Sequence, residues 1–126
     1  MWIDPRTLEQ AREAKREQIN TWRIAATRAG FTFDGRLVST DELGRSDIDG
    51  TNGTVALTGE FPSGWPGYWK AEDNTLIQIP DIPTWKAFYG AMAAKGAANF
   101  ATSQGLKAQL AAAQTKAEVE AVAWPA

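Results

Sequence analysis

The feature that most constrains the fold is a helical stripe in the last third of the chain. Its inward positions recur every three or four residues, as Trp85, Phe88, Met92, Gly96, Asn99, Ser103, Leu106, Leu110 and Ala113. This spacing predicts one helix of about 30 residues and about 45 Å. Asp81 can cap its start, and Pro83 suits its first turn. Much of the remaining surface is alanine, so a second helix backbone can approach it closely.

A first helix, near the start of the chain, is the natural antiparallel partner. Asp4 can cap it, Pro5 suits its first helical position, and Ile3 can close over Leu8 as a hydrophobic staple. Gly30 can take the left-handed conformation that ends it. Its second half carries one apolar face, formed by Ile19, Trp22, Ala26 and Ala29.

Short strands and helices fill the rest of the chain. Asp34-Gly35 predicts a tight turn in a hairpin over residues 31–38, and a second hairpin is expected over 68–79. Ser39 and Glu42 form a capping box before an expected helix over 41–57, although three glycines disfavour that helix. Thr115 opens a short helix over 116–123. We therefore expect a single α+β domain over residues 1–126.

The first half of the first helix is nearly all charge. Between residues 4 and 17 only Leu8, Ala11 and Ala14 are apolar candidates. Such a segment has little to bury, so we expect 4–17 to protrude as a charged helical extension or to bridge to another protein. Candidate partner-binding residues on it are Arg12, Lys15 and Arg16.

Composition excludes several kinds of chemistry. The chain has neither Cys nor His, which removes the usual zinc ligands, thiol nucleophiles and the Ser-His-Asp triad. No basic cluster suggests nucleic acid, no apolar run could span a bilayer, and Met1 to Pro5 lacks the regions of a signal peptide. We expect no enzymatic activity, no catalytic residue, no cofactor and no metal.

The acidic segment from Asp47 to Gly53 is a candidate metal site. It resembles the start of a calcium loop, but Asn52 stands where such a loop requires Gly and Thr58 stands where it needs Glu. A helix end or polar turn explains the segment better. Carboxylates of the same region could include a glycosidase pair, but caps and the helix dipole account for them equally well: Asp41, Glu42, Asp47 and Asp49.

Tryptophan is in surplus, with six residues. Trp22, Trp85 and Trp124 lie on predicted inner faces and are assigned to the core. Trp65, Tyr68 and Trp69 lie on and beside a Pro- and Gly-rich loop, where they could bind a partner's apolar side chain or stack on a sugar ring. For Trp65, core packing and binding stay equal alternatives.

Three motifs carry a resemblance to a known family: Gly30 to Gly35 (GFTFDG), Ser46 to Gly50 (SDIDG) and Thr115 to Trp124. Together with the order of elements, they make the chain resemble uncharacterised domains of tailed phages and prophages, roughly from Ala11 to Trp124. Those domains commonly end proteins encoded near tail-fibre genes and have no established enzymatic activity. The chain departs from the family pattern at Gly53 and around Phe61 to Gly67, where relatives more often continue a helix.

The resemblance implies a non-enzymatic, tail-associated structural or assembly module. Its partners would be other phage tail proteins or further copies of itself, in the host bacterial cytoplasm during assembly or in the virion tail. The alternative is a carbohydrate-binding or cell-wall-cleaving module that contacts glycans through the Trp65 loop. A regulator of a host protein is a third reading that no sequence feature supports.

Overall fold

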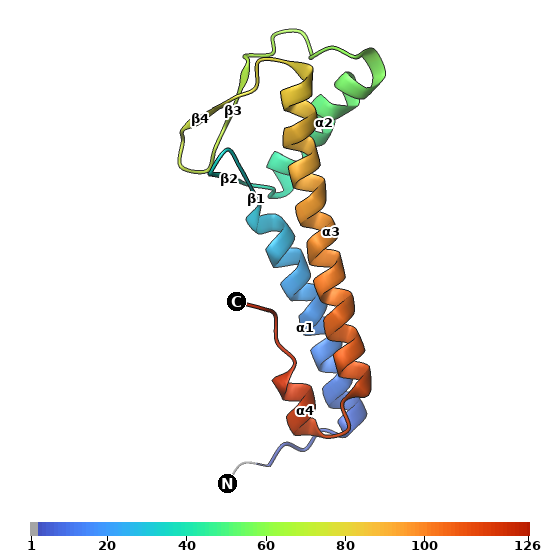
Figure 1. Cartoon of the computed structure of the whole chain (residues 1–126). Coiled ribbons are helices and arrows are strands. Elements are labelled where there is room, and N and C mark those ends of the chain that lie inside the picture. Colours follow the sequence, from blue (N-terminus) through green and yellow to red (C-terminus); the bar gives the residue numbers. More distant parts are fainter. Residues whose placement is uncertain (1–2) are drawn as a thin grey trace. The chain divides into compact units, whose positions relative to one another are not determined.

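The computed structural model describes residues 3–126 and has the predicted α+β composition (Figure 1). In chain order its elements are α1 (Leu8–Ala29), β1 (Phe31–Phe33), β2 (Arg36–Val38), α2 (Glu42–Thr58), β3 (Tyr68–Lys70), β4 (Leu76–Gln78), α3 (Ile82–Ala112) and α4 (Lys116–Ala121). The two predicted hairpins, the long helix and the short last helix are all confirmed.

The chain forms two compact units, and α1 and α3 contribute to both. One unit combines the residues up to Ala25 with Ala98–Ala126, and the other is Ala26–Ala97. We call them the terminal unit and the middle unit. Each has its own apolar core. A single domain over residues 1–126 stays a prediction.

The middle unit is built around an aromatic core. Trp85 and Phe88 of α3 are fully buried, and the rings of Phe31 and Phe33 meet Phe88 edge-on at 5.2 and 5.4 Å between centroids. Both hairpins are antiparallel, with Phe31 opposite Val38 and Trp69 opposite Ile77. The buried residues of this core are Phe31, Val38, Ile48, Val55, Ala71, Ile77, Ile79, Trp85, Phe88 and Met92.

Helix α2 forms in spite of its glycines because one of its faces packs against the core of the middle unit. Ile48 and Val55 lie in the aromatic core. Between them, Asn52 accepts a hydrogen bond of 3.1 Å from the indole nitrogen of Trp85. These tertiary contacts outweigh a glycine cost of about 1 kcal/mol per residue. The doubtful helix over 41–57 is therefore confirmed as Glu42–Thr58.

The terminal unit has an aliphatic core. Ile19 of α1, Leu110 of α3 and Val119 of α4 are among its most deeply buried residues. Trp22 and Trp124 pack against it and are partly buried, in agreement with their predicted core role. The buried residues of this core are Ala11, Ile19, Leu106, Leu110, Ala113, Val119 and Val122.

Two helix starts differ from the prediction. Helix α1 begins at Leu8 and is capped by Thr7 and Gln10, whose side chains bond each other's backbone N–H groups at 2.9 and 3.1 Å. Asp4 and Pro5 lie before the helix, and Ile3 is 77% exposed, so the cap at Asp4 and the staple onto Leu8 were wrong. A Thr-x-x-Gln capping box explains the later start.

For α2, Asp41 is the cap instead of Ser39. Its carboxylate accepts the N–H of Gly44 at 2.7 Å. The Ser39 hydroxyl instead accepts the N–H of Asp41 at 3.3 Å. A carboxylate at this position also interacts favourably with the helix dipole. The caps predicted at Asp81 and Thr115 are confirmed by bonds from Thr84 and Glu118.

The junction between α1 and the first hairpin depends on glycine. Gly30 has φ +108°, and a Cβ there would lie 1.9 Å from the carbonyl oxygen of Val38. Asp34 and Gly35 have φ of 52° and 69°, as a tight turn between twisted strands requires. The chain can enter β1 beside the end of β2 only because residue 30 has no side chain.

We predict that Gly30→Ala destabilises the middle unit by at least about 2 kcal/mol, because the new methyl group adds a backbone clash to a disfavoured φ. Urea unfolding followed by tryptophan fluorescence measures this. Gly90→Ala is the matched control: its Cβ meets nothing within 4 Å, so it should keep or raise stability. Equal stability of the Gly30→Ala protein and the wild type would contradict this account of the junction.

Candidate interaction surfaces

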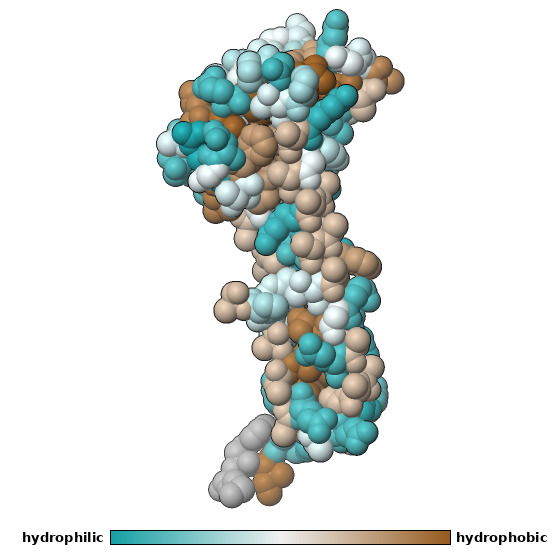
Figure 2. Space-filling view, viewed as in Figure 1, coloured by the Kyte–Doolittle hydropathy of each residue, from teal (hydrophilic) through white to brown (hydrophobic). Residues whose placement is uncertain are grey.

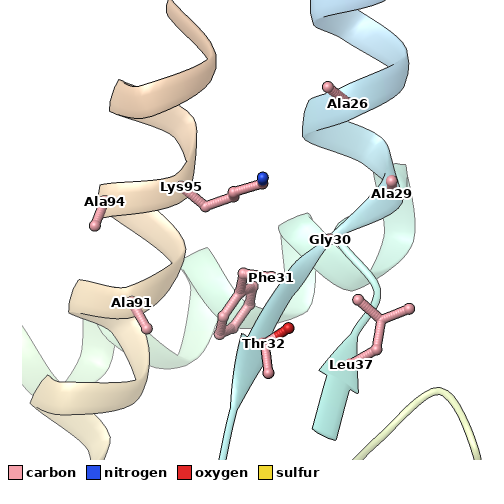
Figure 3. A pocket seen from close by; sticks show the side chains of 9 residues that line it. All are labelled: Ala26, Ala29, Gly30, Phe31, Thr32, Leu37, Ala91, Ala94 and Lys95. Carbon is pink, nitrogen blue, oxygen red and sulfur yellow. The ribbon is translucent and has the colours of Figure 1, made fainter. Parts of the chain in front are cut away.

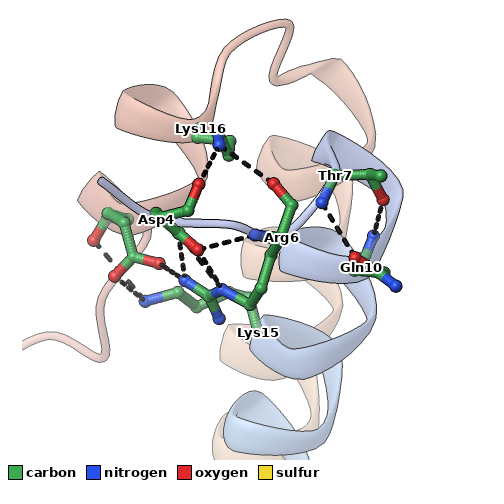
Figure 4. Close-up of polar contacts among 7 residues, drawn as sticks. Asp4, Arg6, Thr7, Gln10, Lys15 and Lys116 are labelled. Atoms are coloured by element: carbon green, nitrogen blue, oxygen red, sulfur yellow. Dashed lines mark hydrogen bonds and ion pairs between the residues drawn. The ribbon is translucent and has the colours of Figure 1, made fainter. Parts of the chain in front are cut away.

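The charged segment before and within α1 contacts α4 (Figure 4). The ammonium of Lys116 donates to the backbone carbonyls of Asp4 and Arg6, both at 2.9 Å. Arg6 forms ion pairs with Asp4 at 2.9 Å and with Glu120 at 3.0 Å. Segment 4–17 therefore has a partner within the chain, which its charge pattern alone did not indicate.

Two of the predicted partner-binding cations stabilise helix ends. Arg12 donates to the backbone carbonyl of Ala113, directly after α3. Lys15, only 7% exposed, lies 3.5 Å from the carbonyl oxygen of Glu120 near the end of α4 and 5.5 Å from the ring centre of Trp22. A cation at a helix C-terminus satisfies free carbonyls and opposes the negative end of the dipole. Arg16 is different, because among residues 3–126 its one ion pair is with Glu13 on the same helix.

The contacts of Asp4 with Arg6 favour its ionised form. The Asp4 carboxylate accepts hydrogen bonds from the guanidinium of Arg6, which has the larger effect, and from the backbone N–H of Arg6. These bonds lower the pKa of Asp4 from 3.8 to about 2. Because the folded pKa lies below the ordinary value, the carboxylate favours the folded state above pH 3.8. That contribution is lost as the pH falls toward 2.

The predicted aromatic loop residues differ in how much surface they leave free. Trp65 stacks on Phe61 with ring centres 4.8 Å apart and planes 4° apart, and its indole nitrogen donates to the carbonyl of Ile79 at 3.1 Å. Trp69 is partly buried against Trp85 and Phe88. Tyr68 points outward on β3 and is exposed. One face and the polar atom of Trp65 are thus used inside the unit.

The acidic residues of α2 are spread around a helix. Asp41 caps it, Asp49 pairs with Arg45 at 2.9 Å, and the hydroxyl of Tyr89 donates to Asp49 at 3.2 Å. Burial, and then the Asp49 charge, raise the pKa of Tyr89. Among residues 3–126 no group of three acidic side chains is placed to hold a metal ion. Since residues 47–53 are helical, their oxygens cannot converge as those of a calcium loop do.

A groove of about 700 Å³ lies in the middle unit, where the end of α1, the first hairpin and α3 meet (Figure 3). Its walls are mostly small and apolar, and among the described residues that line it Lys95 alone is charged. No single sequence pattern indicates this groove, because it brings together positions that are far apart in the chain. The lining residues are Ala26, Ala29, Gly30, Phe31, Thr32, Leu37, Ala91, Ala94 and Lys95.

The outer face of α2 carries two exposed leucines. Leu43 is 70% exposed and Leu57 is 87% exposed, and a spacing of 14 residues places them on one side of the helix. Between them lie Gly50 and Gly53, where a Cβ would meet nothing within 4 Å. Hydrophobic residues are visible at the surface near the C-terminal end of α2, which is green in Figure 1 (Figure 2). We call Leu43, Asp47, Gly50, Gly53 and Leu57 the outer face of α2. This face was not predicted from the sequence, because its two leucines stand 14 residues apart with charged residues and glycines between them.

A family model for a domain of unknown function, DUF4376, matches residues 10–123. The chain belongs to this family. No curated protein and no solved structure is similar enough to count as a match. The DUF4376 assignment covers both units, and it agrees in extent with the resemblance seen in the sequence. Within residues 3–126, no helix combines the length and the apolar character needed to cross a bilayer.

We predict that Asp4 titrates near pH 2 in the folded protein and that Arg6→Gln moves its pKa up toward 3.8, because the guanidinium donors are lost. Carboxyl carbon chemical shifts followed by NMR against pH measure both values. Arg45→Gln removes a cation from the middle unit and should leave Asp4 unchanged. A wild-type Asp4 that already titrates near 3.8 would contradict the contacts described for the charged segment.

Proposed function

We propose that this DUF4376 chain is a non-enzymatic interaction module associated with a phage or prophage tail, where it serves as a structural component or an assembly helper. The observation that carries the proposal is the outer face of α2, on which Leu43 and Leu57 stay exposed. The tail context is supported by the GFTFDG and SDIDG motifs and by the closing helix. Assembly would take place in the host cytoplasm, and the virion tail is the proposed destination.

The outer face of α2 favours protein binding for two reasons. Full burial of a leucine side chain is worth roughly 1.5–3 kcal/mol, so a partner that covers both leucines gains substantially. In addition, Gly50 and Gly53 weaken the helix by about 1 kcal/mol each without relieving any contact inside the chain. Their small size is useful to a partner whose backbone approaches closely.

The contacts of the aromatic loop make glycan binding less favoured. A sugar platform needs a free ring face, and Trp65 gives one face to Phe61 and its N–H to Ile79. Two of the four candidate carboxylates for hydrolysis have local roles, because Asp41 caps α2 and Asp49 pairs with Arg45. Binding through the outer face of α2 is therefore the function that we propose.

The test is co-purification from cells that produce the corresponding phage. We expect the tagged wild-type chain to bring down tail proteins, identified by mass spectrometry, and the double variant Leu43→Ser, Leu57→Ser to lose most of them. Both residues are exposed, so the variant should keep its helical circular dichroism. Leu76→Ser, a change of an exposed leucine on β4, is the matched control and should retain the partners.

Two results would overturn the proposal. One is recovery of host enzymes alone, without any tail protein. The other is undiminished recovery of tail proteins by the folded double variant, since the outer face of α2 would then play no part.

A further inference from the structure

The groove of the middle unit has the chemistry of a docking site for an apolar helix with one acidic residue. Alanines of α1 and α3 form walls that a helix backbone can approach, and Leu37 adds an exposed apolar edge. Lys95 reaches over the groove from α3 (Figure 3). Within residues 3–126 the ammonium of Lys95 has no ion-pair partner.

The outer face of α2 has the complementary chemistry. Leu43 and Asp47 are one helical turn apart, so both side chains point to the same side. Both are exposed, and in the described part of the chain Asp47 pairs with no cation. Gly50, one turn further along, leaves the backbone open to close contact. A leucine, a carboxylate and a bare backbone thus follow one another along one face.

We propose that the outer face of α2 in one copy of the chain docks into the groove of a second copy. Leu43 enters between the alanine walls, and Asp47 pairs with Lys95. This inference rests on the proposed function, since it names the partner of the outer face. Charge complementarity is the argument for this occupant: among residues 3–126, Lys95 in the groove has no ion-pair partner, and neither has Asp47 on the outer face of α2.

The two surfaces are different, so the contact is head-to-tail. The inner face of α2 is occupied by its own core through Ile48, Val55 and the bond from Trp85 to Asn52. The outer face is therefore available to another copy while the groove of the first copy stays open. Head-to-tail contacts form rings or open filaments, in contrast to a two-fold pair of α2 helices, which stops at a dimer.

The experiment is analytical ultracentrifugation of the full chain over a range of concentrations, with two variants. The face variant is Leu43→Ser, which keeps its groove. The groove variant is Lys95→Glu, which keeps its outer face. We expect wild type to assemble beyond the dimer, and each variant alone to associate at least tenfold more weakly. An equimolar mixture should form dimers that grow no further, because only one intact face and one intact groove can meet.

Exchanging the two charges tests the proposed pair of Asp47 and Lys95. The expected result is a gain of association in the double variant, which a loss of folding could not produce. Asp47→Lys alone should weaken assembly, and the double variant Asp47→Lys, Lys95→Glu should restore most of it. Lys86→Glu is the matched control, because Lys86 is an exposed lysine of α3 that does not line the groove. It should assemble like wild type.

Three outcomes would overturn the inference. Wild type could stay monomeric up to its solubility limit, which would leave binding to tail proteins, and so the proposed function, intact. Lys95→Glu could assemble like wild type, as a pairing of two α2 outer faces would predict. The charge exchange could fail to restore association although each protein keeps its circular dichroism spectrum.

Discussion

The structure depends on one physical constraint, which is that a single helix face supplies both cores. Trp85 and Phe88 of α3 anchor the aromatic core of the middle unit, and Leu106 and Leu110 anchor the aliphatic core of the terminal unit. Helix α3 is continuous over 31 residues, and its many alanines and the absence of proline after its first turn favour this continuity. Each of the other elements contributes to one core or the other through this face.

Polar contacts add to this apolar packing. Burial of Ile48 and Val55, together with the bond from Trp85 to Asn52, turns one face of α2 inward and leaves Leu43 and Leu57 outside. In the terminal unit, Arg12 and Lys15 place their charges at the ends of α3 and α4. These contacts of the buried Lys15 and the half-buried Arg12 give the charged half of α1 a structural role, whereas the outer face of α2 has no such role within its unit.

Much of the fold was predictable, and the failures have physical causes. The stripe from Trp85 to Ala113 and the Asp34-Gly35 turn follow from local rules, and both are confirmed. The predicted start of α1 was wrong because two capping patterns compete within four residues: Thr7 and Gln10 together satisfy two backbone N–H groups, whereas Asp4 accepts one, from Arg6. The groove around Lys95 could not be predicted, since its lining joins α1, a hairpin and α3, and only tertiary structure shows which positions meet.

The central claim is that α3 stabilises each unit through a separate stretch of one face. Hydrogen exchange measured by mass spectrometry on Leu110→Ala tests it most directly, because this change removes core contacts from the terminal unit alone, at a cost of about 2–5 kcal/mol. The account predicts faster exchange in α4 and in α1 up to Ala25, with protection of β1 to β4 and α2 kept at the wild-type level. An equal loss of protection in both units would contradict it.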